Sequence, residues 1–231
     1  MSAEPQTLPT TGLTANDRAI LGSLLPRMRR VFERYTSSPL PQWGLFTRTL
    51  RVSRYRKNDA VDQSSHEVLL VISGLLKEVY DEPSIQGQVA DFFAEGSVLA
   101  TRLEPPWARA LTTPFSVISN DSSRSKIPLM TAVAIEPSVV LRVNADVVHE
   151  LSAKHPQWGE AQASFLWTYI EAQHAGILNL RENNTWARYQ ALMARSNLAG
   201  RLTQRDIAAY LGITESALSR LLRRTAEAAR H

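Results

Sequence analysis

The sequence predicts an α+β fold in which a block of short antiparallel strands is followed by helices that include the C-terminal region. Residues 46–143 contain short apolar runs rich in Val, Ile and Leu, separated by Gly, Pro, Asn, Asp and Ser. Such spacing of strand and turn signals is typical of an antiparallel barrel, sandwich or roll. From residue 144 onward, apolar residues instead recur every three or four positions, which is helical spacing.

The composition is that of an ordinary globular protein. With 231 residues, 44% apolar and 21% charged, the chain can bury a core, and we expect two domains rather than one. Only the first dozen residues, MSAEPQTLPTTG, have the composition of a disordered segment. Neither a signal peptide nor an apolar run of about 18 residues is present, so we expect a cytoplasmic protein that does not enter a membrane. The absence of cysteine excludes disulfides, thiolate nucleophiles, cysteine-ligated zinc and iron–sulfur clusters.

Positive charge is concentrated in the last part of the sequence. The net charge is +4, and residues 195–231 contain seven arginines and three acidic residues, whereas the charges of residues 1–194 cancel. A small basic region on a neutral body is typical of a polyanion-binding module, although a solvated basic tail would have the same composition.

The expected elements follow in order along the chain. A helix is expected over 14–35, broken or kinked at Pro26. Strands are expected at LRVSRY (50–55), on both sides of Gly74 in EVLLVISGLLKEVY (67–80), at QVADFFAEGSV (88–98), at LMTAVAI (129–135) and at VVLRV (139–143). Residues 101–126 are expected to form short helix and loop. Asn144 should cap a helix over 145–154, and Pro156 should begin a long helix that reaches residue 183.

The long helix is apolar on two sides. One stripe runs through Trp158, Ala161 and Phe165, and a second through Leu166, Tyr169 and Ile170. A helix with two apolar sides needs two partners. One partner would be the strand block, and the second would be a symmetry mate in a coiled-coil-like homodimer, unless the helix is buried within a single chain.

Residues 202–224, LTQRDIAAYLGITESALSRLLRR, fit a helix-turn-helix unit. Thr203 should cap the first helix, with Asp206 in its first turn, and Thr214 should cap the second. Gly212 stands where the turn needs a positive φ. The remaining positions need aliphatic side chains at the corner and a small residue where the helices cross; these are Ile207, Ala208, Leu211, Ile213, Leu218 and Leu221. A plain helical hairpin is the alternative.

The outer face of the second helix has the residue types that contact DNA. Hydroxyl groups bind phosphates or base edges, and arginine binds guanine or phosphate in the major groove. We expect Arg220 to contact a base, and Ser216 and Ser219 to contact a base or a phosphate. Glu215 shares this face, and the expected phosphate contacts are Thr203, Gln204, Thr214, Arg223 and Arg224.

At this point the sequence resembles the Crp/Fnr family of bacterial transcription regulators. The resemblance extends from about residue 45 to residue 224 and rests on RDIAAYLGITESALSRLLRR and TWARYQALM, with VISGLLKEVY and DFFAEGS as weaker marks. It implies a cyclic-nucleotide-binding-like β-roll, a long dimerisation helix and a C-terminal helix-turn-helix domain. The implied division is an N-terminal tail and helix (1–43), a β-roll sensor (44–151), a dimerisation helix (152–183) and a DNA-binding domain (184–231). It also implies a homodimer that binds double-stranded DNA and contacts RNA polymerase. A regulator of this kind is not expected to be an enzyme.

Two departures from the family pattern concern the DNA-binding unit. The family places Glu two residues after the Thr, where this chain has Ser216, and Glu215 lies one position earlier. A shift of one residue turns a side chain by about 100° around a helix, so the family half-site is not expected to transfer. In addition, only seven residues follow Arg224, too few for the β-hairpin wing of many members.

The effector of the β-roll is not identified by the sequence. Members that bind cyclic AMP use a Gly-Glu loop and an Arg-Ser pair, whereas this chain has Gly96 followed by Ser97, and Pro128-Leu129 at the Arg-Ser position. Arg124 and Ser125 precede that position by four residues, about 13 Å along an extended strand, and with Gly96 and Ser97 they form the candidate effector site. Binding of cyclic AMP in the usual mode is therefore not expected.

Other ligands find less support in the residues. Haem is not supported, because His66, His149, His155 and His174 are scattered. Five aromatic residues either line an apolar pocket between roll and long helix or belong to the core: Trp107, Phe115, Trp158, Phe165 and Trp167. The alternatives to a regulator are a ligand-binding protein with a non-functional helix-turn-helix and a cupin-like metalloenzyme, which would need a His-x-His pair that the sequence lacks.

Overall fold

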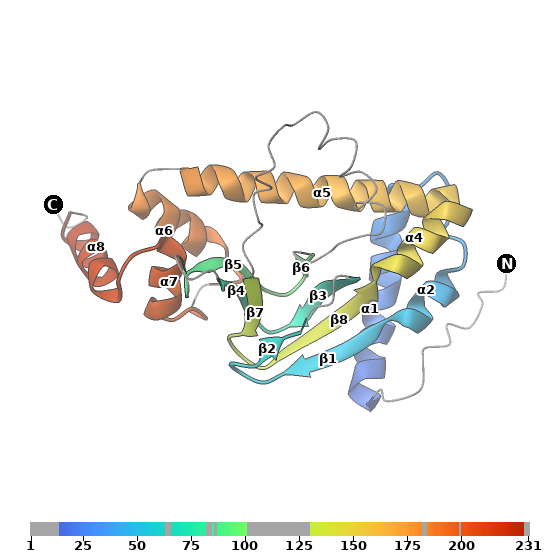
Figure 1. The fold of residues 1–231 in the computed structure, drawn as a ribbon, viewed down its shortest axis with the longest axis horizontal. Helices are drawn as coiled ribbons and strands as arrows, with labels where there is room; N and C mark the ends of the chain where they lie inside the picture. Colours follow the sequence, from blue (N-terminus) through green and yellow to red (C-terminus); the bar gives the residue numbers. More distant parts are fainter. Residues whose placement is uncertain are drawn as a thin grey trace.

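Two four-stranded antiparallel sheets form a β-roll with helices around it (Figure 1). The computed structural model describes residues 14–62, 66–81, 85, 87–100, 130–181, 184–198 and 200–228. One sheet has the order β1-β8-β3-β6 and the other β2-β7-β4-β5. The strands are β1 (Arg51–Tyr55), β2 (Ala60–Val61), β3 (Glu67–Ser73), β4 (Leu76–Tyr80), β5 (Val89–Phe93), β6 (Val98–Leu99), β7 (Met130–Ala134) and β8 (Ser138–Asn144).

The interior of the roll is an apolar cluster to which both sheets contribute. Alternate residues of β3 point to opposite faces, so that Leu69 and Val71 lie inside the roll while Leu70 packs against the helices outside. At the β3–β4 turn, Gly74 has a φ of 92°, and a Cβ there would lie 2.3 Å from the Ser138 hydroxyl oxygen. Only glycine fits this turn.

Four helices cover the outer face of the β1-β8-β3 side. They are α1 (Ala15–Glu33), α2 (Trp43–Thr49), α4 (Ala145–Lys154) and α5 (Pro156–Arg181). Their core is aromatic: Trp43 stacks on Trp158 with ring centroids 6.1 Å apart, and Phe46 contacts both rings. The Trp158 indole N–H donates to the Pro41 carbonyl at 2.7 Å, so this buried ring has its hydrogen bond.

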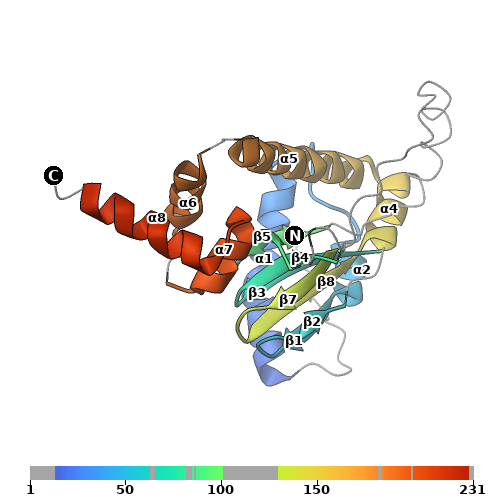
Figure 2. The ribbon, with the colours of Figure 1, turned by 60° about the vertical axis from the view of Figure 1, so that its left-hand side comes forward.

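Three helices follow α5, namely α6 (Thr185–Ala194), α7 (Gln204–Leu211) and α8 (Glu215–Ala228). They lie at the opposite end of the molecule from α1 and α2, next to β4 and β5 (Figures 1 and 2). No helix in the described part of the chain combines the length and the apolarity that a membrane span requires.

The structure confirms the expected strands and caps and corrects other expectations. The Asn144 side chain accepts hydrogen bonds from Asp146 N at 2.8 Å and from Val147 N at 3.4 Å, as a cap of α4. The prediction of a break at Pro26 was wrong: α1 continues through it, with Leu21 and Leu25 both buried in the helical core. Helix α2 and the two-residue strand β2 were not predicted. The expected loop over 101–126 and the first dozen residues lie outside the described residues.

Candidate nucleic-acid interface

Helix α7 begins at a reciprocal capping box. The Thr203 hydroxyl oxygen accepts from Asp206 N at 3.1 Å, and the Asp206 carboxylate accepts from Thr203 N at 3.4 Å and from the Thr203 hydroxyl at 2.6 Å. Asp206 is only 6% exposed, yet it also accepts from Lys77 Nζ at 2.6 Å. Burial raises the pKa of Asp206, but the bonds from Lys77 and Thr203 outweigh that effect and hold the pKa below its ordinary value. The first turn of α7 is therefore fixed by charged hydrogen bonds.

The turn between α7 and α8 has the conformation that the sequence predicts. Gly212 has φ 69° and ψ 31°, and its N–H bonds back to the end of α7. Ile213 N then donates to the Ala208 carbonyl at 3.0 Å. The Thr214 hydroxyl accepts from Ala217 N at 3.2 Å and lies 3.0 Å from the Ser216 hydroxyl, which makes it the cap of α8.

The two helices cross over a buried corner. Ile207, Ala208, Leu211 and Leu218 are buried, and Ile213 packs against them. Burial of these apolar side chains fixes α8 relative to α7 without any contribution from the outer face of α8. The structure thus forms the predicted helix-turn-helix rather than a plain hairpin.

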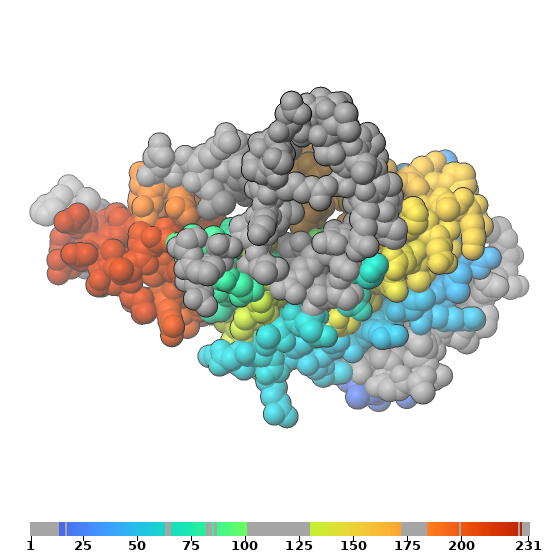
Figure 3. Space-filling model, viewed as in Figure 1, coloured from blue at the N-terminus to red at the C-terminus, as the bar shows by residue number. Residues whose placement is uncertain are grey.

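The outer face of α8 is exposed to solvent. The two helices form one end of the molecule, coloured red in the space-filling view (Figure 3), and α8 extends away from the roll (Figure 2). All the expected DNA contacts are exposed: Thr203, Gln204, Thr214, Glu215, Ser216, Ser219, Arg220, Arg223 and Arg224. The structure brings them to the N-terminal turn of α7 and along one side of α8, where Arg223 makes a loose pair with Glu227 at 3.8 Å. The Thr203 hydroxyl already donates to Asp206, whereas the hydroxyl of Ser219 and the guanidinium groups on α8 can donate hydrogen bonds to phosphates and base edges.

The arrangement of roll, long helix and helix-turn-helix is shared with solved structures. No family model matches the sequence, and no curated protein matches it significantly. FixK2 from Bradyrhizobium japonicum is 21% identical with a TM-score of 0.55, covering 78% of this chain and 86% of that one. A cyclic nucleotide-binding domain containing protein from Listeria monocytogenes is 15% identical with a TM-score of 0.54, covering 90% and 91%. A transcriptional regulator of the Crp/Fnr family from Eubacterium rectale is 15% identical with a TM-score of 0.53, covering 79% and 81%.

The chain has the Crp/Fnr fold. This agrees with the α+β architecture that the sequence predicted, including the β-roll. At such low identity the likeness shows the fold, and the ligand and operator have to be argued from the residues of this chain.

The candidate effector site is described only in part. Gly96 and Ser97 form the β5–β6 turn, where Gly96 N donates to the Val71 carbonyl at 2.8 Å and Gly96 has a φ of 82°. Arg124 and Ser125, the other half of the candidate site, lie outside the described residues, as do Trp107 and Phe115. Glu78, whose charge acts on Tyr169 of α5, was not singled out from the sequence. Glu78 on β4 is only 3% exposed. The pKa of Tyr169 on α5 is raised, first by the burial of the tyrosine and second by the negative charge of Glu78.

The aromatic residues of α5 divide between core and surface. Trp158 belongs to the core, and Phe165 stacks on Tyr169 with centroids 6.3 Å apart. For Trp167 both expectations, a pocket lining and a core position, were wrong. Its side chain is 65% exposed to solvent. Its indole N–H donates to Glu171 at 3.0 Å.

In the part of the chain that the structure describes, no three His, Asp or Glu side chains are grouped so that they could hold a metal ion. His66 lies against Asp146, with the nearest atoms 3.0 Å apart.

The ion pairs that join the helix-turn-helix to the roll were not predicted from the sequence. Arg195, Arg201 and Asp206 each form an ion pair with a residue of the roll. Their partners lie more than 60 positions away in the sequence, so no local signal identifies them.

Proposed function

We propose that the protein is a homodimeric, sequence-specific DNA-binding regulator of transcription. The observation that carries the proposal is the capped helix-turn-helix, whose outer face exposes Ser219, Arg220 and Arg223 together on α8. Concentration of the net positive charge in residues 195–231 supports it. Under this proposal residues 1–43 precede a sensor roll over 44–151, residues 152–183 form the dimerisation helix, residues 184–231 bind DNA, and the regulator acts with RNA polymerase in the cytoplasm.

Dimerisation would place two recognition helices in successive major grooves. Trp167 and Ile170, 65% and 45% exposed, lie three residues apart on α5 and form an apolar surface. A symmetry mate covering this surface would bring two α8 helices to a near-palindromic operator, with half-sites about 34 Å apart.

Recovery of bound DNA tests the proposal. Purified protein is mixed with fragmented genomic DNA, and bound fragments are sequenced and aligned. A near-palindromic motif with half-sites about one helical turn apart is the expected result. If the protein retards no DNA even at low salt, the alternative of a ligand-binding protein with a non-functional helix-turn-helix is correct. Hydrolytic or oxidative activity that depends on an added metal would instead support the cupin-like enzyme.

Arginine variants separate base recognition from phosphate binding. We expect Arg220→Ala to reduce the preference for operator over random DNA by about 5- to 150-fold, because a bidentate base contact contributes about 1–3 kcal/mol of discrimination. Arg223→Ala should weaken binding to both DNAs equally and lower the slope of log K against log salt by about one. Fluorescence anisotropy over a salt series measures both effects. Equal losses on both DNAs for both variants would refute the assignment.

Cyclic AMP is not expected to be the effector in the usual mode. In the β5–β6 turn Gly96 is followed by Ser97, where the members that bind cyclic AMP have Glu. Pro128 and Leu129 stand where those members have the Arg-Ser pair, so the cyclic phosphate would lack its bidentate charged partner. Equilibrium dialysis with labelled cyclic AMP should show no binding at millimolar nucleotide, and saturable binding of one nucleotide per chain would overturn this expectation.

A further inference from the structure

The helix-turn-helix region (residues 184–228) packs directly on the roll through an apolar cluster. Leu75, Phe92 and Ile135 of the roll are buried together with Ile207 and Leu211 of α7. The Phe92 and Tyr210 rings are 5.6 Å apart. Apolar burial holds the two parts together, and polar contacts across the same interface add directional bonds to it.

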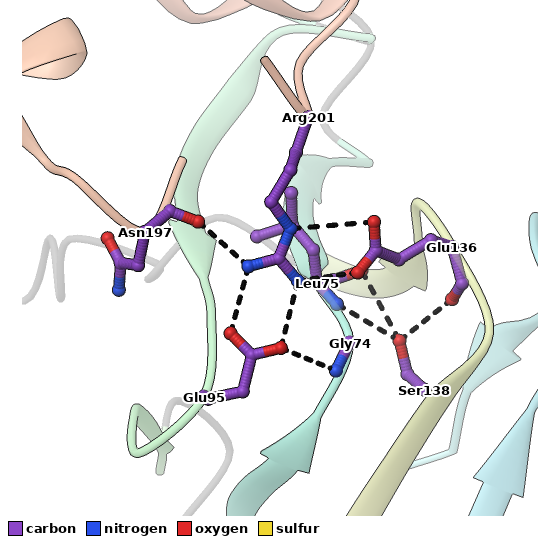
Figure 4. Close-up of polar contacts among 7 residues, drawn as sticks. All are labelled: Gly74, Leu75, Glu95, Glu136, Ser138, Asn197 and Arg201. Carbon is purple, nitrogen blue, oxygen red and sulfur yellow. Dashed lines mark hydrogen bonds and ion pairs between the residues drawn. The ribbon is translucent and has the colours of Figure 1, made fainter. Parts of the chain in front are cut away.

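Arg201 supplies a directional contact across the same interface (Figure 4). Its Nη1 and Nη2 donate to the two oxygens of Glu95 at 2.8 and 3.0 Å, as a bidentate pair. Nη2 also donates to Glu136 at 2.5 Å, and Nη1 to the Asn197 carbonyl at 2.8 Å. One planar guanidinium therefore lies between two carboxylates of the roll, and its plane fixes the angle at which the chain enters α7.

The Glu95 carboxylate and the backbone of Glu136 are themselves held by the turns of the roll. Glu95 accepts from Gly74 N at 2.9 Å. The Ser138 hydroxyl donates to the Glu136 carbonyl at 2.8 Å and accepts from Leu75 N at 3.2 Å. Figure 4 shows these groups around the guanidinium. Glu95 in the β5–β6 connection and Glu136 in the β7–β8 connection are thus both tied to the β3–β4 turn of the roll.

Two further charged contacts attach the region at other points. Lys77 Nζ donates to Asp206 at 2.6 Å. Arg195 donates to Asp91 at 2.6 Å and to the Phe92 carbonyl at 2.6 Å. The region is thus attached to the roll by three charged contacts, of which that of Arg201 joins two carboxylates of the roll.

We propose that Arg201, held between Glu95 and Glu136, is a positioning residue that sets the orientation of α8 on the roll. The inference rests on the proposed function, because orientation matters where two α8 helices of a dimer must meet half-sites at a fixed spacing. This arrangement of Arg201, Glu95 and Glu136, the Arg201 clamp, does not block DNA, since the outer face of α8 is exposed while the ion pairs are formed. Its role is to select one operator spacing from those that a loosely attached region would accept.

Hydrogen–deuterium exchange of the full chain tests the clamp without DNA. Arg201→Ala should raise exchange at amides 74–75 and 195–211 by about two- to fivefold, the range expected for ion pairs that are partly exposed. The double variant Glu95→Gln with Glu136→Gln should have the same effect from the side of the roll. Arg205→Ala, which removes the same charge from the exposed side of α7, is the matched control and should leave these amides unchanged. Unchanged exchange in the Arg201 and Glu95/Glu136 variants would overturn the proposal.

Operator spacing provides the second measurement. On DNA recovered by selection, half-sites are moved apart or together by one and two base pairs. The wild-type protein and Arg205→Ala should discriminate against altered spacings, whereas Arg201→Ala and the Glu95/Glu136 double variant should lose about fivefold of that discrimination. Arg201→Lys keeps the charge without the fork and should recover only part of it. Equal discrimination in all variants would overturn the positioning role. Failure to recover any operator would refute the proposed function, while the exchange result would still decide whether the clamp exists.

Discussion

At the scale of single residues, Glu95 shows how a surface carboxylate can be committed to one partner. Hydrogen bonds from Arg201 hold the pKa of Glu95 at about 2, against an ordinary value of 4.5, although burial acts in the opposite direction. Because the folded pKa is depressed, the stabilisation is complete above the unfolded value and is lost as the pH falls toward the folded one. The clamp is therefore insensitive to pH in the physiological range.

A pH series on Glu95→Gln tests this assignment. At pH 7 the Tm of the variant should lie about 2 °C below that of the wild-type protein, a small effect because the carboxylate is partly exposed and screened. The difference should narrow as the pH falls from 4.5 to 3. Glu227→Gln, on the exposed side of α8, is the control and should show no such trend. A constant difference for Glu95→Gln from pH 7 to pH 3 would contradict the link between the clamp and the depressed pKa.

At the scale of elements, the apolar surface of α5 leads to a prediction about assembly. Trp167→Glu combined with Ile170→Glu places two charges where the proposed dimer buries apolar groups, and should raise its dissociation constant at least about tenfold. Light scattering coupled to size exclusion measures the shift toward monomer, with circular dichroism confirming that helix content is kept. Tyr35→Glu alters another exposed aromatic residue, 58% exposed and outside α5, and should leave the dimer intact. A wild-type monomer at all concentrations would refute the proposed dimer.

Elements with local chemical signals were predictable from the sequence, and those that depend on distant contacts were not. Asn144 and Thr203 cap their helices because a short polar side chain satisfies free N–H groups of the first turn, which is a local effect. Helix α2 has no such signal: Gln42 precedes it in a left-handed conformation without a side-chain cap, and the burial of Trp43 and Phe46 against Trp158 accounts for it. The same reasoning applies to the site.

The exposed face of α8 was predicted because helical periodicity separates its inner from its outer residues. The Arg201 clamp was not predicted, since Glu95 lies 106 positions away and only the folded roll brings it close. A run of arginines at the C-terminal end therefore has two uses in this chain. Arg220 and Arg223 are exposed and are the residues that we propose to contact DNA, whereas Arg195 and Arg201 form ion pairs within the protein.

At the scale of the whole molecule, the helix-turn-helix region shares its core with the roll. Leu192, Leu198 and Leu218 are buried in the same cluster as Leu75 and Phe92 of the roll. Cutting the chain between the two parts would expose the apolar side chains of both. A segment of fewer than about 50 residues buries too little surface of its own to offset that loss.

We therefore expect a fragment of residues 184–231 to be largely unfolded in isolation. Its circular dichroism should show well under half of the helix that the full chain has over this range, with a gradual melt in place of a cooperative one. Adding the complementary fragment 1–183 should restore helicity, because Phe92 and Leu75 then cover the exposed side of α7. The same mixture with Phe92→Ala in the larger fragment is the control, and should restore less, since a buried Phe→Ala change costs about 3–5 kcal/mol. A cooperative melt of the 184–231 fragment alone would show that the region folds independently, and orientation on the roll would then rest on the charged contacts without a shared core.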